Sequence, residues 1–467
     1  MSQAPPMVLI DAVGLTTRLL AMAPRLNALA KAGWDRPIRE VVPAVTCTAQ
    51  ASLLTGVPPS GHGIVGNGWF FRDTGEVRFW QQSNRLIESE PLYVTAKKRA
   101  AAEGRNFKVA QLFWWFNQGA AVDLSVTPKP YYGADGNKAF GIFGSPDGLT
   151  TRLEIELGTF PFHTFWGPGA GLACTSWIAR SAASVLRDER PDLTLVYLPH
   201  LDYDPQRFGR SKSDLPRLVG ELDQACEPLL DQARKSGAQV WVVSEYGHCD
   251  VDQVVEPNRI LRRAGLLNIR SGPFGEVFDP FTSRAFAVCD HQVAHIYVAD
   301  PADIGRVVDH LGEVPGVARL LVGPEREEVG LDHPRSGEVV ALSTPSAWFA
   351  YPFWLDDAQA PDYARTVDIH RKPGYDPCEL FLDPALKVPK LRIARRLLGK
   401  KLGFRTLFDV ISLDSSIVRG SHGLPADKAE ERPVLIGQGE VPSAGRDLAT
   451  TDVRNLILAA LGFGGPE

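Results

Sequence analysis

The sequence predicts an α/β protein, a three-layer α/β/α sandwich with a mostly parallel central sheet and a smaller inserted α+β cap. Three observations favour this fold class. Short apolar runs alternate with stretches of helical periodicity, acidic residues follow the apolar runs, and residues 257–362 differ in character from the rest of the chain. Alternation of strands and helices is typical of a parallel sheet that is covered by helices on both faces.

The predicted elements alternate in the order that such a sheet requires. Residues 7–14 (MVLIDAVG) predict a buried strand, and residues 18–33 carry apolar residues at helical spacing up to Gly33. The segment 48–56 (TAQASLLTG) begins a second helix that ends at Gly56. Further along, we expect a strand at 193–204, a long amphipathic helix at 215–237 and a buried strand at 238–248.

The composition excludes several classes of protein. The 467 residues are 44% hydrophobic and 22% charged, which is ordinary for a globular protein with a large core. A net charge of -5 argues against a nucleic-acid polymer as partner. There is no basic and apolar leader and no run of about 18 apolar residues, so we expect no membrane partner. Six scattered cysteines without Cys-x-x-Cys spacing favour a reducing, cytoplasmic location.

The chain is predicted to consist of one interrupted core and one insertion. Residues 1–256 form the first part of the α/β core, and residues 363–467 return to it. Residues 257–362, with short strands and many turn residues, form a cap subdomain that packs over the core and helps to enclose the site.

Acidic residues end three of the predicted strands. Asp11 ends the first, Asp202 and Asp204 end the strand at 193–204, and Glu245 with His248 ends the strand at 238–248. A single acid in this place is commonly a helix cap. Three strands that end in acid are better explained by a shared crevice at the carboxyl edge of the sheet, which is where open α/β sheets bind ligands.

The segment 41–56 (VVPAVTCTAQASLLTG) joins a predicted strand to a predicted helix. It places three hydroxyl residues and a cysteine at a helix start, where backbone N–H groups converge and favour an anion. Two interpretations stay open at this point: the segment could be the seat of a nucleophile or only the start of a helix.

These motifs, taken in order, resemble a known superfamily. Asp11 is followed by PAVTCTAQASLLTG, GHGIVGNGWFF, YLPHLDYD, VVSEYGH and finally GSHG, over residues 7 to about 437. The series resembles the alkaline phosphatase superfamily, and within it the branch of the nucleotide pyrophosphatase/phosphodiesterases and phosphonoacetate hydrolase. SLLTGVPPSGHGIVGN is its most specific part.

The resemblance implies a metal-dependent phosphoryl-ester hydrolase, with phosphodiesters or pyrophosphates as small phosphorylated substrates. Thr46 matches the family nucleophile, which forms a covalent phospho-threonine intermediate, and Thr48 is the alternative register. Gln50 is expected to contact a non-bridging phosphoryl oxygen. Metal coordination would lower the pKa of the threonine hydroxyl enough for attack.

The resemblance also implies two divalent metal ions, with zinc as the family default. Asp11, Glu245 and Thr46 would hold one ion. Asp202 and His422 would hold the other, completed by Gln206 or by a substitute. Two such ions can hold the attacking and leaving oxygens of an in-line displacement.

The chain departs from the family pattern at two expected histidines. Gln206 stands four residues after Asp202, and Tyr246 follows Glu245, so two imidazoles are missing. An oxygen-rich site would favour manganese, magnesium or iron over a pair of zinc ions. His370, on a turn-rich segment near the returning core, is predicted to replace a missing ligand. The other candidates are His200, His248, and the pair His291 and His295, which would lie together if their segment were helical, although IYVAD after them reads as strand.

Aromatic residues near the motifs predict a place for the substrate. Asn67 and Trp69 (NGWFF) and Trp115 (LFWWFN) are predicted to contact it, because an aromatic slot could stack a nucleobase or another planar group. Core packing is the alternative for any such run. Trp114 and Trp115 cannot both face inward on a regular strand, so we expect one of them to face a crevice or the insertion.

Three alternatives to a phosphodiesterase stay open at this stage. The same scaffold could serve a phosphonate C–P hydrolase or a phosphomonoesterase. The departures at Gln206 and Tyr246 would also fit a ligand-binding homologue that has lost catalysis. A sulfatase is not favoured, because CTAQA lacks the proline and arginine of the cysteine-modification motif.

Overall fold

A computed structural model describes residues 4–134, 138–404, 406–439 and 447–464. Its central sheet has nine strands. They are β1 (Met7–Ala12), β2 (Trp34–Arg39), β5 (Val109–Leu112), β6 (Leu124–Pro128), β9 (Ile142–Ser145), β10 (Leu193–Leu198), β11 (Gln239–Val243), β22 (Val434–Gly437) and β23 (Leu448–Ala449).

The sheet is mixed but mostly parallel. Its strand order is β23-β2-β22-β11-β1-β10-β5-β6-β9. The neighbours from β11 to β6 pair in parallel, whereas β22 and β9 run antiparallel to the strands beside them. Every residue of β1 and β10 is buried, as expected for parallel strands that are covered on both faces. The predicted fold class is confirmed.

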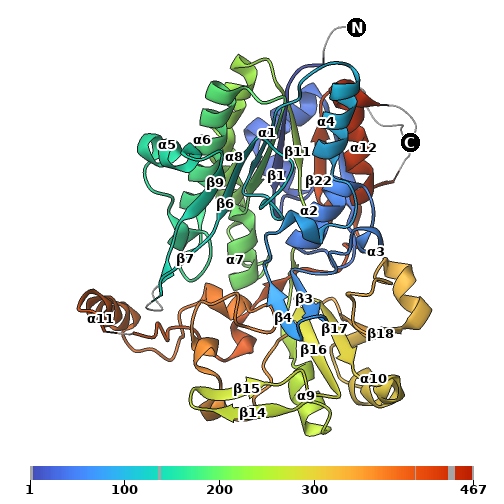
Figure 1. Ribbon diagram of the computed structural model, residues 1–467, viewed down its shortest axis with the longest axis vertical. Coiled ribbons are helices and arrows are strands. Elements are labelled where there is room, and N and C mark those ends of the chain that lie inside the picture. The colour runs from blue at the N-terminus through green and yellow to red at the C-terminus, as the bar shows by residue number, and fades with distance from the viewer. Residues whose placement is uncertain (1–3, 135–137, 405, 440–446, 465–467) are drawn as a thin grey trace.

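Helices cover both faces of this sheet (Figure 1). On one face α8 contacts both α6 and α1, and on the other α2, α4 and α12 contact one another. The bounds of the larger helices are α1 (Pro24–Ala32), α2 (Thr46–Thr55), α4 (Leu92–Ala102), α5 (Leu149–Leu157), α6 (Leu172–Glu189), α7 (His200–Phe208), α8 (Leu215–Lys235), α11 (Pro389–Lys401) and α12 (Val453–Leu458). None of the described helices is long and apolar enough to cross a membrane.

A second, antiparallel sheet lies below the first in Figure 1. Its order is β16-β17-β19-β18, and its helices are α9 and α10. The bounds are β16 (Ala285–Asp290), β17 (Val293–Val298), β18 (Val317–Val322), β19 (Val339–Ser343), α9 (Pro257–Arg263) and α10 (Ile304–Gly312). The hairpin of β3 (Gly68–Phe71) and β4 (Glu76–Phe79) packs against β16.

The remaining short elements connect these parts of the chain. They are α3 (Pro59–His62), β7 (Tyr131–Tyr132), β8 (Lys138–Ala139), β12 (Cys249–Asp250), β13 (Gln253–Val255), β14 (Ile269–Gly272), β15 (Gly275–Phe278), β20 (Ala347–Phe349) and β21 (Gly420–Ser421). Among them, β12 pairs with β21 and so joins the segment after β11 to the segment before His422.

A buried apolar cluster joins the two sheets beside α2. It contains Cys47 of α2, Trp115 after β5, and Val293 and Leu342 of the second sheet. The first turn of α2 therefore lies at the junction between the nine-stranded sheet and the second sheet.

Two predicted elements differ from the observed ones, and prolines explain both. The strand predicted at 193–204 is wrong beyond Leu198, because α7 begins at His200 directly after Pro199. Proline has no N–H group with which to continue a strand ladder. The helix predicted at 18–33 is divided into a 3-10 helix, Leu19–Met22, and α1, which begins at Pro24. Proline suits the first position of a helix because its missing N–H would have no partner there.

The helix expected from TAQASLLTG is confirmed and begins slightly earlier. It starts at Thr46, after an extended Val45, and its last helical residue is Thr55. Gly56 ends it with a φ of 73°, a left-handed conformation that glycine adopts without strain.

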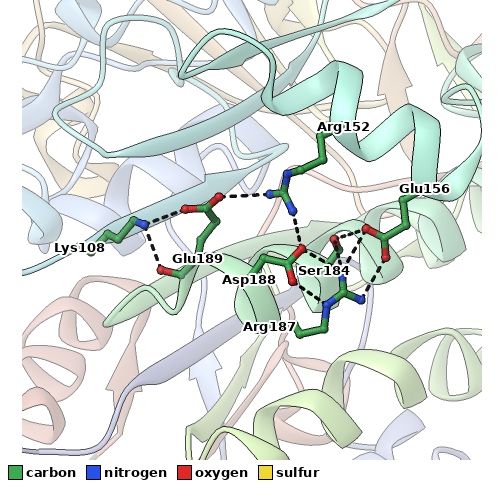
Figure 2. Close-up of polar contacts among 7 residues, drawn as sticks. All are labelled: Lys108, Arg152, Glu156, Ser184, Arg187, Asp188 and Glu189. Carbon is green, nitrogen blue, oxygen red and sulfur yellow. Dashed lines mark hydrogen bonds and ion pairs between the residues drawn. The ribbon is translucent and has the colours of Figure 1, made fainter.

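The carboxyl end of α6 carries a surface network of ion pairs in addition to its buried apolar side chains (Figure 2). Arg187 pairs with Glu156 of α5 and with Asp188, and Lys108 pairs with Glu189 at 2.8 Å. These side chains are a third to a half exposed, so water and salt weaken each pair. The network orders the edge of the sandwich.

Candidate metal centre

The carboxyl ends of three neighbouring strands bring the candidate residues together. Asp11 lies near the end of β1, Glu245 follows the adjacent β11, and Asp202 lies in the first turn of α7 after β10. Thr46 begins α2, and His422 follows β21. All five side chains are buried.

One side of this site combines a carboxylate with imidazoles. Potential ligand atoms of Asp202, His248 and His422 all lie within 4.8 Å of one another. The Nε2 atom of His248 is 3.0 Å from Oδ1 of Asp202, and Nε2 of His422 is 3.7 Å from the same oxygen. His422 donates from Nδ1 to the carbonyl oxygen of Ala44 at 2.7 Å, which leaves the Nε2 lone pair facing Asp202.

The charges on this side suit a metal ion. Burial lowers the pKa of His422 well below its ordinary value, so this imidazole is neutral. Burial by itself would raise the pKa of Asp202. The hydrogen bond with His248 and the neighbouring His422 outweigh that effect and lower this pKa to about 2. An ionised carboxylate beside neutral imidazole is a donor set that zinc, iron and manganese accept.

His291 lies next to this group with one nitrogen available. Its Nδ1 donates to Oδ1 of Asp290 at 2.8 Å, and its buried Nε2 has no hydrogen-bond partner among the described residues. Burial lowers the pKa of His291 to about 3, so the ring is neutral. Metal-ligating histidines are commonly oriented by a carboxylate on the other ring nitrogen, in the way that Asp290 orients His291.

Four aromatic rings stack in a column through the site. The centroid of His422 is 3.7 Å from the centroid of Tyr246 and 3.7 Å from that of His291. His291 stacks in turn on Tyr375, also at 3.7 Å. The hydroxyl of Tyr375 donates to Oε1 of Gln206 at 2.7 Å. The column fixes the planes of both imidazoles.

The other side of the site contains only oxygen and amide groups. Gln50 donates from Nε2 to Oε1 of Glu245 at 2.7 Å and to Oδ2 of Asp11 at 3.3 Å. The backbone N–H of Trp115 donates to Oε1 of Gln50 at 2.8 Å, which sets the orientation of the amide. Gln50 is thus engaged with protein groups, an arrangement that differs from the expected contact with a phosphoryl oxygen.

Two buried carboxyl groups share this side without a cationic side chain. Burial raises the pKa of Asp11 to about 7 and that of Glu245 well above its ordinary value. Oδ1 of Asp11 and Oε2 of Glu245 are buried and have no hydrogen-bond partner among the residues that the structure describes. Two adjacent carboxyl groups in a dry site either share a proton or need a cation between them if both are to ionise.

Tyr246 connects the two sides through the Thr46 hydroxyl. Oγ1 of Thr46 is 3.1 Å from the hydroxyl of Tyr246, which donates to Oδ1 of Asp202 at 3.3 Å. Thr46 also lies in the first turn of α2, where the backbone N–H groups have no helical acceptor. Thr48, the alternative register, is fully buried, and its hydroxyl has no partner in the described part of the chain.

Several predicted histidines lie elsewhere. His370 is exposed, with Nδ1 at 3.4 Å from the carbonyl oxygen of Phe79, and it is not part of the group around Asp202. His200 is 3.0 Å from Glu221. His295 lies in β17 and hydrogen-bonds the carbonyl of Val65, so a helical pairing with His291 is wrong. The short, nearly continuous run of apolar, β-branched and aromatic residues in VAHIYV indicates a buried strand.

Gln206 does not join the group around Asp202 either. It lies on α7, one turn after Asp202, and is fully buried. Its Oε1 is occupied by Tyr375, while its Nε2 has no partner among the described atoms. The structure brings His248, rather than Gln206, to Asp202.

The residues predicted to contact a substrate are packed inside the protein. Asn67 accepts a hydrogen bond from the N–H of Cys47 at 3.0 Å and donates to Asp290 at 3.1 Å. Trp69 stacks on Phe71 with centroids 5.0 Å apart. As expected from the WW pair, one ring meets the insertion, since Trp115 packs in the cluster that contains Val293 and Leu342.

Sequence reasoning did not find the residues that support the imidazoles. Tyr375 has no local signal, because its stacking on His291 depends on the path of a distant segment. Asp290 directly precedes His291, and this neighbouring acid could have indicated an oriented histidine.

The comparison with known families decides the relationship of the chain. The model of the family described as Type I phosphodiesterase / nucleotide pyrophosphatase matches residues 7–376. The chain belongs to this family. The resemblance to the nucleotide pyrophosphatase/phosphodiesterase branch of the alkaline phosphatase superfamily is confirmed, and the family is one of phosphodiester and pyrophosphate hydrolases.

Individual relatives are distant. The human ectonucleotide pyrophosphatase/phosphodiesterase family member 1 is 24% identical over 238 residues, which are 49% of this chain and 21% of that protein. The chain therefore spans about a fifth of this relative.

Solved structures share the fold. Phosphonoacetate hydrolase from Sinorhizobium meliloti 1021, in complex with phosphonoformate, aligns with a TM-score of 0.61 and 16% identity over 98% of this chain and 96% of its own. Murine ectonucleotide pyrophosphatase/phosphodiesterase 5 aligns with a TM-score of 0.57 and 14% identity over 99% and 96%. An inactive form of the murine protein, in complex with AMP, aligns with a TM-score of 0.57 and 13% identity over 99% and 96%.

Proposed function

We propose that the chain hydrolyses phosphodiesters or pyrophosphates through attack of the Thr46 hydroxyl on phosphorus. One observation carries this proposal. The Thr46 hydroxyl, at the start of α2, is joined through Tyr246 to Asp202, which belongs to the group of potential metal ligands with His248 and His422. A hydroxyl that is held in this way beside carboxylates and imidazoles suits phosphoryl transfer better than ligand binding without catalysis.

The residues present fit two divalent cations. Asp202, His248 and His422 would hold one, with Nε2 of His291 as a further donor, and this imidazole-rich side favours zinc. Asp11, Glu245 and Thr46 would hold the other, and their oxygens favour manganese, magnesium or iron. The unpartnered Oδ1 of Asp11 and Oε2 of Glu245 support this second assignment. Bound cations would lower the pKa of the threonine hydroxyl and neutralise charge on the phosphoryl group.

The protein groups would then act in a fixed order. Thr46 Oγ1 attacks phosphorus, the bond to the leaving oxygen breaks, and a phospho-threonine forms that water later hydrolyses. Tyr246, bonded to Thr46 on one side and to Asp202 on the other, orients the hydroxyl and offers a route for its proton. The backbone N–H of Cys47 is held by Asn67, so the N–H groups of Thr46 and Thr48 in the first turn of α2 would receive the phosphoryl oxygens.

Other predicted residues take supporting roles in this proposal. Gln50 holds Asp11 and Glu245 in place, and Asn67 fixes the start of α2 through Cys47. Trp69 and Trp115 would shape the wall of the site rather than stack on a base. Residues 257–362 would form the cap over a core made of 1–256 and 363–467.

A matched pair of variants tests the nucleophile. Thr46→Ala should abolish turnover and leave the cation of the Asp202, His248 and His422 side, measured by mass spectrometry, in place. Thr48→Ala removes a buried, unpartnered hydroxyl two residues away and should keep most of the activity. Acid quenching during turnover should trap a phosphorylated peptide that contains Thr46. Retained turnover in Thr46→Ala would exclude this residue as nucleophile, and loss in Thr48→Ala alone would assign the alternative register.

Three substrates distinguish the remaining enzyme alternatives. A nitrophenyl phosphodiester should be hydrolysed faster than a nitrophenyl monophosphate or phosphonoacetate. Preference for phosphonoacetate would instead assign C–P bond hydrolysis, and preference for the monoester a phosphomonoesterase. Absence of turnover on all three, together with no metal after reconstitution, would identify a ligand-binding homologue.

A further inference from the structure

The helix α11 has a composition unlike the rest of the chain. The segment from Lys387 to Lys401 contains seven lysines and arginines and no acidic residue, in a protein whose net charge is -5. It also contributes to a concentration of exposed large apolar side chains. These are Val388, Leu391, Leu397, Leu398, Leu402, Phe404 and Leu407. Figure 1 shows α11 at the edge of the molecule, away from the nine-stranded sheet.

One face of α11 attaches the helix to the body of the protein. Arg396 forms an ion pair with Asp409 at 2.9 Å, and Arg392 pairs with the same carboxylate. Between them, Ile393 packs against the buried cluster that contains Val410 and Ile411. This face is therefore fixed, and the opposite face is turned outward.

The outward face carries an apolar stripe between cations. Leu391, Leu398 and Leu402 are spaced by seven and four residues, so they lie on one side of the helix, and they are 66%, 58% and 65% exposed. The N–H of Leu402 still donates to the carbonyl of Leu398 at 3.0 Å, which extends the helical turn to this residue. The helical positions of Lys390, Arg395 and Lys401 flank the stripe on both sides, and none of the three forms an ion pair in the described part of the chain.

We propose that this face of α11 docks on the surface of an anionic lipid bilayer. Exposed leucines flanked by unpaired lysines and arginines are the pattern of a helix that lies in the membrane interface. The leucines would enter the boundary of the acyl chains, while the cations would meet the negative headgroups. Each cation near such a surface strengthens binding about fivefold.

A bilayer suits this face better than a folded protein. A helix of 13 residues is about 20 Å long and about 10 Å wide, so its exposed face covers roughly 200 Å². Stable protein interfaces bury about 800 Å² on each partner. A bilayer needs no such area, because it accepts the apolar side chains individually and attracts all the cations at once.

This proposal modifies the expectation of no membrane partner. That expectation came from the absence of a long apolar run, which bears only on helices that cross a bilayer. Here the helix would lie parallel to the surface, and the nine-stranded core would stay outside the lipid. The proposal does not depend on the chemistry at Thr46.

Vesicle flotation of the full-length protein tests this surface. Vesicles of phosphatidylcholine mixed with phosphatidylglycerol should carry the protein, whereas vesicles of phosphatidylcholine alone should carry at least tenfold less. Binding should weaken as salt is raised, because headgroup attraction is screened. Changing Lys390, Arg395 and Lys401 together to Gln, or Leu391, Leu398 and Leu402 together to Ser, should each weaken binding by at least about tenfold.

Matched substitutions elsewhere control for total charge and total hydrophobicity. Lys31, Lys212 and Lys235 are exposed lysines on other elements and can be changed together to Gln, and Ile155 and Phe274 are exposed and can be changed to Ser. These controls should float like the parent protein. All variants should keep the parent melting temperature and solution turnover, since none touches the core or the metal centre.

Three outcomes would overturn the proposal. The parent protein could fail to float with anionic vesicles at low salt. It could float equally well with both kinds of vesicle, and the change of Lys390, Arg395 and Lys401 to Gln could leave its flotation unchanged. It could instead form a dimer by light scattering that the leucine variant abolishes, without binding vesicles, which would assign the face to a second copy of the chain.

Discussion

The two sides of the candidate metal centre meet at Thr46 but are built from different chemistry. On one side Asp202 is already ionised and His422 and His291 are already neutral, since their pKa values are shifted in those directions. On the other side burial raises the pKa of Asp11 to about 7. These three groups of the imidazole side can therefore accept a cation without releasing protons near neutral pH. The carboxylate side must release a proton before it binds a cation. We therefore expect it to bind its cation after the imidazole side and at higher pH.

The largest expected effect follows from removal of the anion on the imidazole side. Asp202→Ala should lose the cation of this side and reduce turnover by at least about a thousandfold, because both a metal ligand and the partner of Tyr246 disappear. Metal content by mass spectrometry and turnover of a nitrophenyl phosphodiester measure the two losses.

Asp204→Ala is the matched control for this variant. Asp204 lies two residues further along α7 and pairs with Arg207 and Arg217 near the surface. It should keep both the metal and the activity. Equal metal content in Asp202→Ala and Asp204→Ala would contradict the assignment of the imidazole side.

The next effect is a difference in how the two sides respond to pH in the metal-free protein. Asp11 has a folded-state pKa near 7, above the ordinary value of 3.8, so the folded protein binds more protons than the unfolded chain between these values. Its contribution to the free energy of unfolding therefore falls as pH rises from about 4 to about 7, by at most about 4 kcal/mol. Asp202 has a pKa near 2, so its stabilising contribution to the free energy of unfolding is lost only as pH falls below about 4.

Urea unfolding of the metal-free protein at several pH values between about 5 and 8 measures this slope. Asp11→Asn should make this slope shallower, since an amide does not titrate, and Glu245, whose pKa is also raised, accounts for part of what remains. Added metal should reverse the trend by binding the ionised carboxylates. A metal-free protein that gains stability from pH 5 to pH 8 would show that Asp11 is ionised throughout.

A smaller effect is expected from the hydroxyl that joins the two sides. Tyr246→Phe keeps the ring that stacks on His422 but removes the hydrogen bonds to Thr46 and Asp202. Turnover should fall by about 10–100-fold, with both cations retained, as is typical for groups that position a ligand or nucleophile. Tyr246→His, which restores the usual family residue, should strengthen metal binding on the carboxylate side. A loss of metal in Tyr246→Phe would instead make Tyr246 a ligand.

Local pattern predicted those elements that carry a clear signal in their own residues. The continuous apolar run of β1, the amphipathic period of α8 and the terminal glycine of α2 all agree with the structure. The prediction of a strand beyond Leu198 was wrong. The residues after Pro199 alternate in polarity because they lie on a short amphipathic helix.

The positions of Asp11, Asp202, Glu245 and His248 after three predicted strands indicated that these residues meet at one edge of the sheet, and the family resemblance added Thr46 and His422. Neither observation made His248 the partner of Asp202 or separated His291 from the other histidines. His248 reaches Asp202 because of the path of the loop after β11, and His291 occupies a turn between β16 and β17 with a φ of 59°. Both depend on tertiary placement, which no local spacing reports.

The smallest effect concerns the residue that the family pattern would make a ligand. Gln206 accepts a hydrogen bond from Tyr375 and lies beside the ring column, so Gln206→Leu should leave the Tyr375 hydroxyl unpaired and lower the free energy of unfolding by about 1–3 kcal/mol. The metal content of the imidazole side should not change, because His248 occupies the place beside Asp202. Thermal unfolding and mass spectrometry of Gln206→Leu and His248→Leu, side by side, separate the two roles. If Gln206→Leu lost the cation and His248→Leu kept it, the amide oxygen of Gln206 would be the ligand in place of His248. The imidazole side would then have one imidazole ligand fewer and would differ less from the carboxylate side.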